Sequence, residues 1–130
     1  MSPSLVILLA EDEELIGMTL QLALEDGGFE VRHVMTGEQA FAYFADAPVL
    51  CSGLVTDIRL GTGPDGWALA RCAREAIPTI PVVYMSGDSA HEHSARGVPD
   101  SVMLQKPFAP VQLLTALATL VNAVPPDQPS

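Results

Sequence analysis

Short apolar runs alternate with segments of helical periodicity along most of the chain. The runs predict strands at residues 5–10, 50–56, 81–85 and 101–104, and residues 30–34 are interpreted as a further, shorter strand. The segments that follow them predict helices at residues 13–26, 36–44, 67–76, 91–96 and 110–124. Unbroken apolar runs are typical of strands buried on both faces of a parallel sheet. Five strand–helix pairs in alternation therefore predict an α/β fold, a doubly wound parallel sheet with helices on both faces.

Local signals at the helix ends give further expectations. Thr36 is expected to cap the second helix through its side-chain oxygen. Gly66 is expected to allow a turn conformation that other residues avoid, just before the third helix. Trp67 is expected to be a partly buried anchor at the start of that helix. His91 and His93 are expected to face solvent in a weak fourth helix.

The charge balance narrows the classes of partner. Sixteen Asp and Glu residues outnumber six Lys and Arg residues, which gives a formal net charge of -10 and a pI near 4.4. Binding to nucleic acid requires clustered basic side chains, so we expect no nucleic-acid partner. An anionic membrane surface is disfavoured for the same reason. The balance favours cationic partners or a bound metal ion.

Other features of the sequence suggest a cytoplasmic protein. Cys51 and Cys72 lack the spacing of a zinc site, and we expect them to be reduced thiols. The chain has no apolar run long enough, ~18 residues, to span a membrane, and its N-terminus lacks the pattern of a signal peptide. We expect one domain over residues 1–124 and a disordered, proline-rich tail over residues 125–130. The short tail favours a stand-alone protein over a fragment of a longer one.

Polar residues follow four of the predicted strands, where ligands bind in folds of this class. Glu11 and Asp12 follow the first strand, Asp57 the third, Ser86 the fourth and Lys106 the fifth. Carboxylates suit Mg²⁺, and an ammonium and a hydroxyl suit the oxygens of a phosphoryl group. The set indicates a site that holds a phosphoryl group beside a metal ion, with Asp57 as a nucleophile that forms an acyl phosphate.

Each of these segments has a structural explanation when taken alone. The acidic run 11–14 suits the first turn of a helix, because the helix dipole favours negative charge there. Asp57 and the Ser86-Gly87-Asp88 segment suit turns or caps. Their combination at successive strand ends is much more specific than any one of them.

At these segments the sequence resembles the receiver domain of two-component response regulators. The resemblance covers residues 4–122, and four segments carry it: Leu8–Glu13, Val55–Leu60 with Asp65–Gly66, Val82–Gly87 and Lys106–Phe108. It implies a flavodoxin-like fold with five helices and a five-stranded sheet in the order 2-1-3-4-5. It also implies that Asp57 accepts a phosphoryl group, with Mg²⁺, from a sensor histidine kinase or a histidine phosphotransfer protein.

The resemblance assigns roles to individual residues. Glu11, Asp12, Asp57 and the backbone carbonyl of Arg59 match the metal ligands of the family. Ser86 matches the switch hydroxyl, and Lys106 the lysine that pairs with the phosphoryl group. The peptide bond between Lys106 and Pro107 is implied to be cis, a rare isomer.

One position departs from the family pattern. Receivers usually carry Tyr or Phe three residues before the lysine, where this chain has Met103. Either Met103 serves as a flexible apolar plug in the same role, or the allosteric switch is weak. Tyr84 is a candidate substitute, although a buried strand residue is its simpler interpretation.

Two other functions compete with the phosphoacceptor. A dehalogenase-like phosphatase needs a second Asp two residues after the nucleophile, where this chain has Arg59, and a longer chain. A degenerate receiver would serve only as a protein-binding module, but every phosphorylation residue is present. We therefore expect a signalling domain that acts through a downstream protein effector. It is not expected to be an enzyme, beyond its own phosphotransfer and dephosphorylation.

Overall fold

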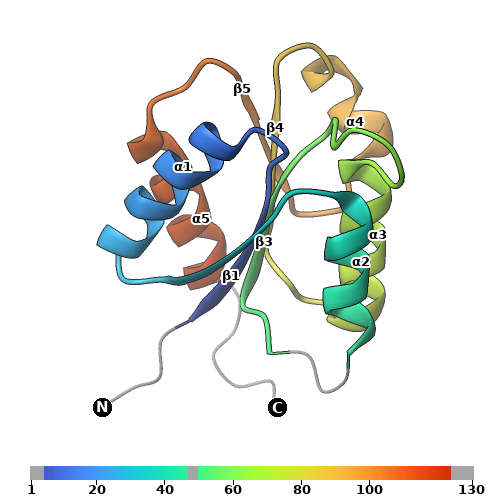
Figure 1. The fold of residues 1–130 in the computed structure, drawn as a ribbon, viewed down its shortest axis with the longest axis horizontal. Helices are drawn as coiled ribbons and strands as arrows, with labels where there is room; N and C mark the ends of the chain where they lie inside the picture. Colours follow the sequence, from blue (N-terminus) through green and yellow to red (C-terminus); the bar gives the residue numbers. More distant parts are fainter. Residues whose placement is uncertain (1–4, 47–49, 124–130) are drawn as a thin grey trace.

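The structure is a computed structural model that describes residues 5–46 and 50–123. Strands and helices alternate along it (Figure 1). The strands are β1 (Val6–Ala10), β2 (Glu30–Val34), β3 (Gly53–Asp57), β4 (Val82–Ser86) and β5 (Val102–Gln105). The helices are α1 (Glu14–Asp26), α2 (Gly37–Ala45), α3 (Gly66–Ala76), α4 (His93–Arg96) and α5 (Pro110–Ala123). The predicted tail at residues 125–130 lies outside the described residues.

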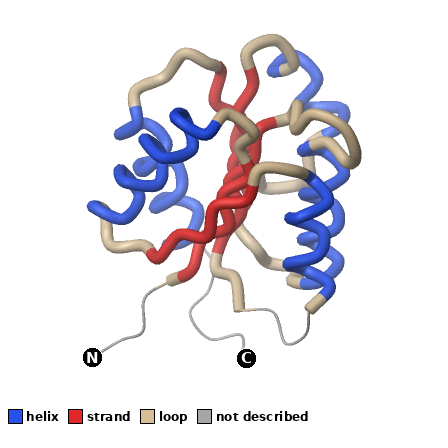
Figure 2. The backbone as a smooth tube through the Cα atoms, viewed as in Figure 1, coloured by secondary structure: helices blue, strands red, loops and turns tan. Residues whose placement is uncertain are grey.

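The five strands form one parallel sheet in the order β2-β1-β3-β4-β5, which confirms the predicted flavodoxin-like fold. Helices α1 and α5 cover one face of the sheet, and α2, α3 and α4 cover the other (Figures 1 and 2). Because β1 and β3 are neighbours at the centre, the residues that follow them meet at one edge of the sheet.

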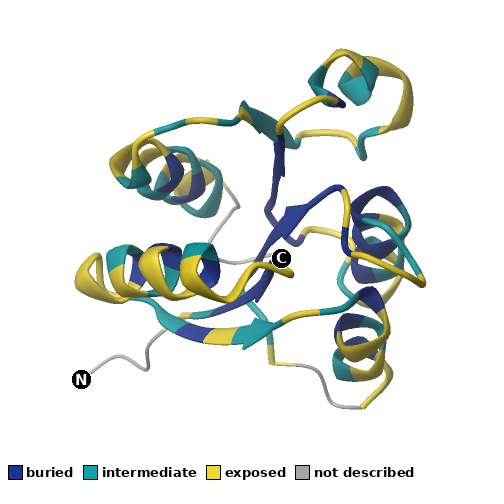
Figure 3. Cartoon of the chain, turned by 45° about the horizontal axis from the view of Figure 1, so that its top comes forward, coloured by how far each residue is buried: buried dark blue, intermediate teal, exposed yellow. Residues whose placement is uncertain are grey.

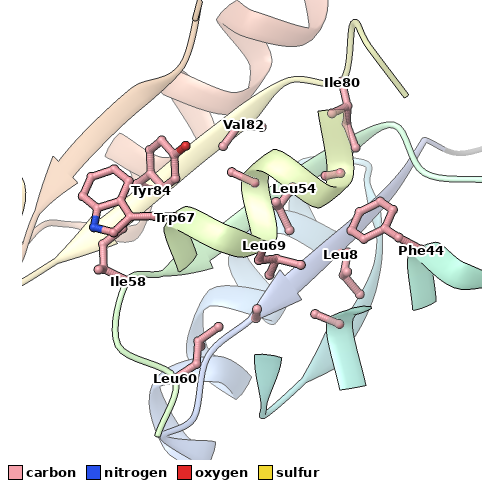
Figure 4. Close-up of a cluster of buried hydrophobic side chains, with 14 residues drawn as sticks. Leu8, Phe44, Leu54, Ile58, Leu60, Trp67, Leu69, Ile80, Val82 and Tyr84 are labelled. Carbon is pink, nitrogen blue, oxygen red and sulfur yellow. The ribbon is translucent and has the colours of Figure 1, made fainter. Parts of the chain in front are cut away.

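The two faces of the sheet carry separate apolar cores, as a doubly wound fold requires. Alternate residues of β1 point to opposite faces, so that Leu8 joins the core under α2 and α3, and Ile7 and Leu9 join the core under α1 and α5. Figure 4 shows the first of these cores, with the Trp67 and Tyr84 rings beside each other. Central strands are the most deeply buried part of the chain (Figure 3).

One predicted strand boundary is wrong, and the predicted fourth helix divides into two short parts. β3 begins at Gly53 and not at residue 50, because its pairing with β1 starts at Ile7 opposite Gly53 and Leu50 is 76% exposed. The fourth helical segment is a single 3₁₀ turn, Ala90–Glu92, followed by the four residues of α4. The N-cap prediction is confirmed, since the Thr36 hydroxyl accepts the backbone N–H of Gln39.

Three single-residue expectations need correction. Gly66 is the first residue of α3 and adopts no unusual turn conformation; a Cβ there would lie 2.3 Å from the carbonyl oxygen of Asp57. Trp67 is fully buried, because its ring packs against Tyr84 at a centroid distance of 4.8 Å. His93 is half-buried against the Tyr84 ring and hydrogen-bonds the Ser101 hydroxyl, whereas His91 faces solvent as expected.

None of the helices in residues 5–46 and 50–123 has the length and apolar character needed to cross a membrane.

Candidate functional site

Three carboxylates meet at the carboxyl ends of β1 and β3. Glu11 and Asp12 follow β1, and Asp57 is the last residue of β3. One oxygen from each carboxylate lies within 4.8 Å of the others. Glu11 and Asp57 are buried, while Asp12 is exposed at the mouth of the site. A cluster of carboxylate oxygens open to water on one side fits a hard divalent cation such as Mg²⁺, which retains several of its waters.

Lys106 brings a positive charge to the same cluster. Its Nζ donates to Oδ2 of Asp57 at 2.7 Å and to Oε1 of Glu11 at 3.2 Å. The backbone N–H of Lys106 donates to the carbonyl of Ser86, which ties the end of β5 to β4, and the Lys106–Pro107 peptide bond is cis. Partial burial alone lowers the pKa of Lys106, but its bonds to Asp57 and Glu11 outweigh this and raise it.

Glu11 is the most constrained of the acids. Its Oε2 accepts the backbone N–H of Glu13 at 3.1 Å, while its Oε1 accepts from Lys106. Burial raises the pKa of Glu11 to about 7, and the charge of Asp57 adds to the effect, against the Glu13 N–H and Lys106. Three carboxylates share this cluster with one lysine, and the excess of acidic groups favours a bound cation.

Ser86 lies at the same edge of the sheet, at the end of β4. Met85, the residue before Ser86, pairs with Asp57 in the register of β3 and β4. The buried Ser86 hydroxyl accepts the backbone N–H groups of Ser89 at 2.7 Å and Asp88 at 3.2 Å. The structure thus joins Glu11, Asp57 and Lys106 by direct bonds, whereas the hydroxyl of Ser86 bonds to its own loop.

An ion pair lies beside the site, and the sequence did not lead us to expect it. The Arg59 guanidinium donates to both carboxylate oxygens of Asp88, at 3.1 and 2.7 Å. The backbone N–H of Arg59 also faces Oδ1 of Asp57 at 3.4 Å. The hydrogen bonds and charge of Arg59 lower the pKa of Asp88. A signal was present, because the two residues carry opposite charges two places beyond the ends of neighbouring strands.

Two hollows flank the site. The first is mainly apolar and runs between α1 and the segment that follows β5; it is lined by Leu15, Ile16, Thr19, Leu20, Lys106, Pro107, Phe108 and Pro110. The second is more polar and lies beside α4; its lining includes Asp12, Arg59, Asp65, Trp67, Glu92 and Arg96. Each hollow is lined by one residue of the cluster, Lys106 in the first and Asp12 in the second.

Met103 lies on β5, directly opposite Tyr84 in the register of β4 and β5. Its side chain is half-buried and packs against the core under α2 and α3. Tyr84 is fully buried, and its hydroxyl accepts the backbone N–H of Val98 at 3.0 Å. The large aromatic side chain in this region therefore belongs to β4 and not to β5.

Comparisons with known proteins agree on one family. A family model described as the response regulator receiver domain matches residues 7–118. The response regulator receiver protein CpdR of Brucella abortus is 35% identical over 104 residues, which cover 78% of this chain and 84% of that protein. The transcriptional regulatory protein RprY of Bacteroides fragilis is 28% identical over 127 residues, 95% of this chain but 52% of that protein.

A solved structure gives the same result at higher similarity. The crystal structure of a response regulator receiver protein from Sinorhizobium medicae superposes with a TM-score of 0.89 and is 44% identical. The superposition covers 92% of this chain and 96% of the other. The likeness thus extends over nearly the whole of both molecules.

Proposed function

This chain belongs to the response regulator receiver domain family of two-component signalling, and on that basis we propose that Asp57 is its phosphoacceptor. The donor is the phosphohistidine of a sensor histidine kinase or of a histidine phosphotransfer protein. One observation carries the proposal: Asp57 ends a central strand, where it pairs with Lys106 and shares a potential metal site with Glu11 and Asp12.

The transfer follows from this arrangement. A carboxylate oxygen of Asp57 attacks the phosphorus atom, the bond from phosphorus to the histidine nitrogen breaks, and an acyl phosphate forms. The phosphoryl group brings about -1.5 to -2 charges to an edge that already holds two other acids. Lys106, within 2.7 Å of Asp57, stabilises this charge. Its pKa is raised, so the amino group stays protonated at neutral pH.

Mg²⁺ is the cofactor that the donor set fits. Glu11, Asp12, Asp57 and the backbone carbonyl of Arg59 would hold it, and when bound it neutralises charge on the transferred group. The acids outnumber the one lysine that contacts Glu11 and Asp57, so transfer without the cation is electrostatically unfavourable.

Ser86 is the proposed link between phosphorylation and the rest of the molecule. Its hydroxyl now accepts two backbone N–H groups of its own loop, at 2.7 and 3.2 Å. A bond from this hydroxyl to the phosphoryl group would turn it toward Asp57 and weaken those contacts. The segment from residue 86 to residue 99, with its short helical turns, is then the part that responds.

The apolar hollow beside α1 is the proposed docking place of the phosphodonor. This hollow is lined by Leu15, which is exposed, and by Lys106, which contacts Asp57. A partner helix that binds there would therefore reach the Asp57 side of the site. A downstream protein effector would then read the changed segment. We propose a cytoplasmic receiver domain over residues 1–124 that catalyses only its own phosphotransfer and dephosphorylation. The free state of Cys51 and Cys72 agrees with that location.

The test is a mass measurement after incubation with acetyl phosphate and Mg²⁺. The wild-type protein should gain one phosphoryl group, Asp57→Asn none, and chelation of the metal should prevent the gain. Asp46→Asn is the matched control, since Asp46 follows α2 and lies outside the site. No gain in the wild type would identify a degenerate receiver that only binds other proteins, and an equal gain in Asp57→Asn would place the acceptor elsewhere.

A further inference from the structure

The geometry points to His33 as a positioning residue for the metal site, because it holds the peptide group that joins the two ligands Glu11 and Asp12. This inference rests on the metal binding included in the proposed function. His33 lies near the end of β2, outside the carboxylate cluster, and pairs with Leu9 of β1 in the sheet register. Nothing in its sequence position marks it as part of the site.

The contact with Glu11 is direct. Nε2 of His33 lies 2.9 Å from the carbonyl oxygen of Glu11. A carbonyl oxygen only accepts hydrogen bonds, so Nε2 carries the proton and donates it. The backbone N–H of Glu11 donates in turn to the carbonyl of Val34 at 3.1 Å. The end of β2 thus holds Glu11 on both sides, its N–H through Val34 and its C=O through His33.

The first turns of α1 leave room for this ring. A Cβ placed on Gly17 would lie 2.1 Å from Cε1 and 2.4 Å from Nε2 of His33. Gly17 is buried within a helix, where glycine is less favourable than alanine. The imidazole therefore lies directly against the helix backbone, and any side chain at position 17 would displace it. Gly17 and His33 fit each other as a pair.

The held peptide group is the one that connects the two metal ligands. The carbonyl of Glu11 and the N–H of Asp12 belong to one planar peptide unit, so rotation of that unit would move the Asp12 carboxylate. The Glu11 side chain is already fixed by the Glu13 N–H and by Lys106. Asp12 is exposed, and the peptide held by His33 is what orients it. Groups that orient metal ligands affect affinity by about 10- to 100-fold.

The experiment measures Mg²⁺ affinity in the full chain for wild type, His33→Leu and His33→Gln. Calorimetry gives the affinity, and the fluorescence of Trp67, which lines the same hollow as Asp12, gives a second reading. Loss of the donor in His33→Leu should weaken Mg²⁺ binding about tenfold. The amide of His33→Gln can still donate, and should recover most of that loss. Arg32→Leu, an exposed neighbour on β2, is the matched control and should bind as wild type does.

A second pair of variants keeps the inference testable if His33→Leu folds poorly. Gly17→Ala should weaken Mg²⁺ binding in the wild-type background, because its methyl group displaces the ring, but not in the His33→Ala background. Equal losses in both backgrounds would overturn the inference. So would a variant of His33 that loses stability to urea, measured with chelator, yet binds Mg²⁺ as tightly as wild type. Failure of the wild type itself to bind Mg²⁺ would overturn the metal part of the proposed function, and this inference with it.

Discussion

Lys106 and Asp57 lie 49 residues apart in the sequence, yet their Nζ and Oδ2 atoms are only 2.7 Å apart. The same ammonium group lies 3.2 Å from Oε1 of Glu11, whose side chain is fully shielded from solvent. One cation therefore serves two buried carboxylates, and with Asp12 beside them the site carries an excess of acidic groups. This relationship determines how the site should respond to substitution and to metal.

Substitution of Lys106 should leave more of the negative charge of the site uncompensated. Lys106→Met keeps most of the side-chain volume but removes the ammonium, so it should lower the free energy of unfolding by about 1–3 kcal/mol without metal. Saturating Mg²⁺ should restore part of the loss, because the cation neutralises the same carboxylates. Urea denaturation with and without metal measures both values. Arg71→Met, on the exposed face of α3, is the control, and an equal loss with and without Mg²⁺ would contradict the prediction.

Gly66 should tolerate no side chain. A Cβ there would lie 2.3 Å from the carbonyl oxygen of Asp57 and 2.9 Å from Cα of Ile58, and both neighbours are backbone atoms with little freedom to shift. Gly66→Ala should therefore lower the free energy of unfolding by about 1–3 kcal/mol, as overpacking typically does. Gly87→Ala is the control, since no atom apart from those of its chain neighbours lies within 4 Å of its Cβ position. Similar losses in urea for the two variants would disprove the packing explanation.

The hydroxyl of Tyr84 should stabilise the segment after α4. It accepts the backbone N–H of Val98 at 3.0 Å, and burial raises the pKa of Tyr84, so the phenol stays neutral. Tyr84→Phe should cost about 1 kcal/mol and speed hydrogen exchange at the Val98 amide. Tyr43→Phe removes an exposed hydroxyl that donates to the Leu50 carbonyl, and should cost less. Unchanged exchange at Val98 would show that the bond does not protect this segment.

The Arg59–Asp88 pair gives a prediction on pH. Hydrogen bonds from Arg59 hold the pKa of Asp88 below its ordinary value, so Arg59→Ala should raise that pKa toward it. Because the folded-state pKa is depressed, the pair stabilises the fold above the ordinary pKa of Asp, and this is lost as the pH falls through the depressed value. Carboxyl NMR titration of Asp88 measures the change. Arg32→Ala, remote from Asp88, should leave it unaltered.

The two expectations for the switch differ in how Met103 responds to phosphorylation. It packs against the core beside Tyr84, so we predict that it follows Ser86 on phosphorylation as a flexible apolar plug. Amide and methyl resonances should then change from the loop after β4 as far as Met103. Met103→Leu, which keeps the volume, should preserve this spread. If the changes stay within the carboxylate cluster, Met103 does not support an allosteric switch.

The fold was predictable because its signals are local. Most of the strands are short apolar runs and the longer helices are amphipathic segments, and these patterns depend only on neighbours in the sequence. The boundaries were less predictable where an apolar run extends beyond its pairing partners. Leu50 continues the run of β3 by composition, but it is 76% exposed, and the register with β1 begins only at Gly53, opposite Ile7.

The sequence alone determined the alternation of strands and helices, the acids and the lysine at the strand ends, and the expectation that they meet. It determined these because parallel strands bring their carboxyl ends to one edge, whatever the details of packing. Only the tertiary structure decided the bond from His33 to Glu11, the clearance that Gly66 leaves for Asp57, and the pairing of Arg59 with Asp88. These depend on distances between residues far apart in the chain, and such distances are set when helices and strands pack together.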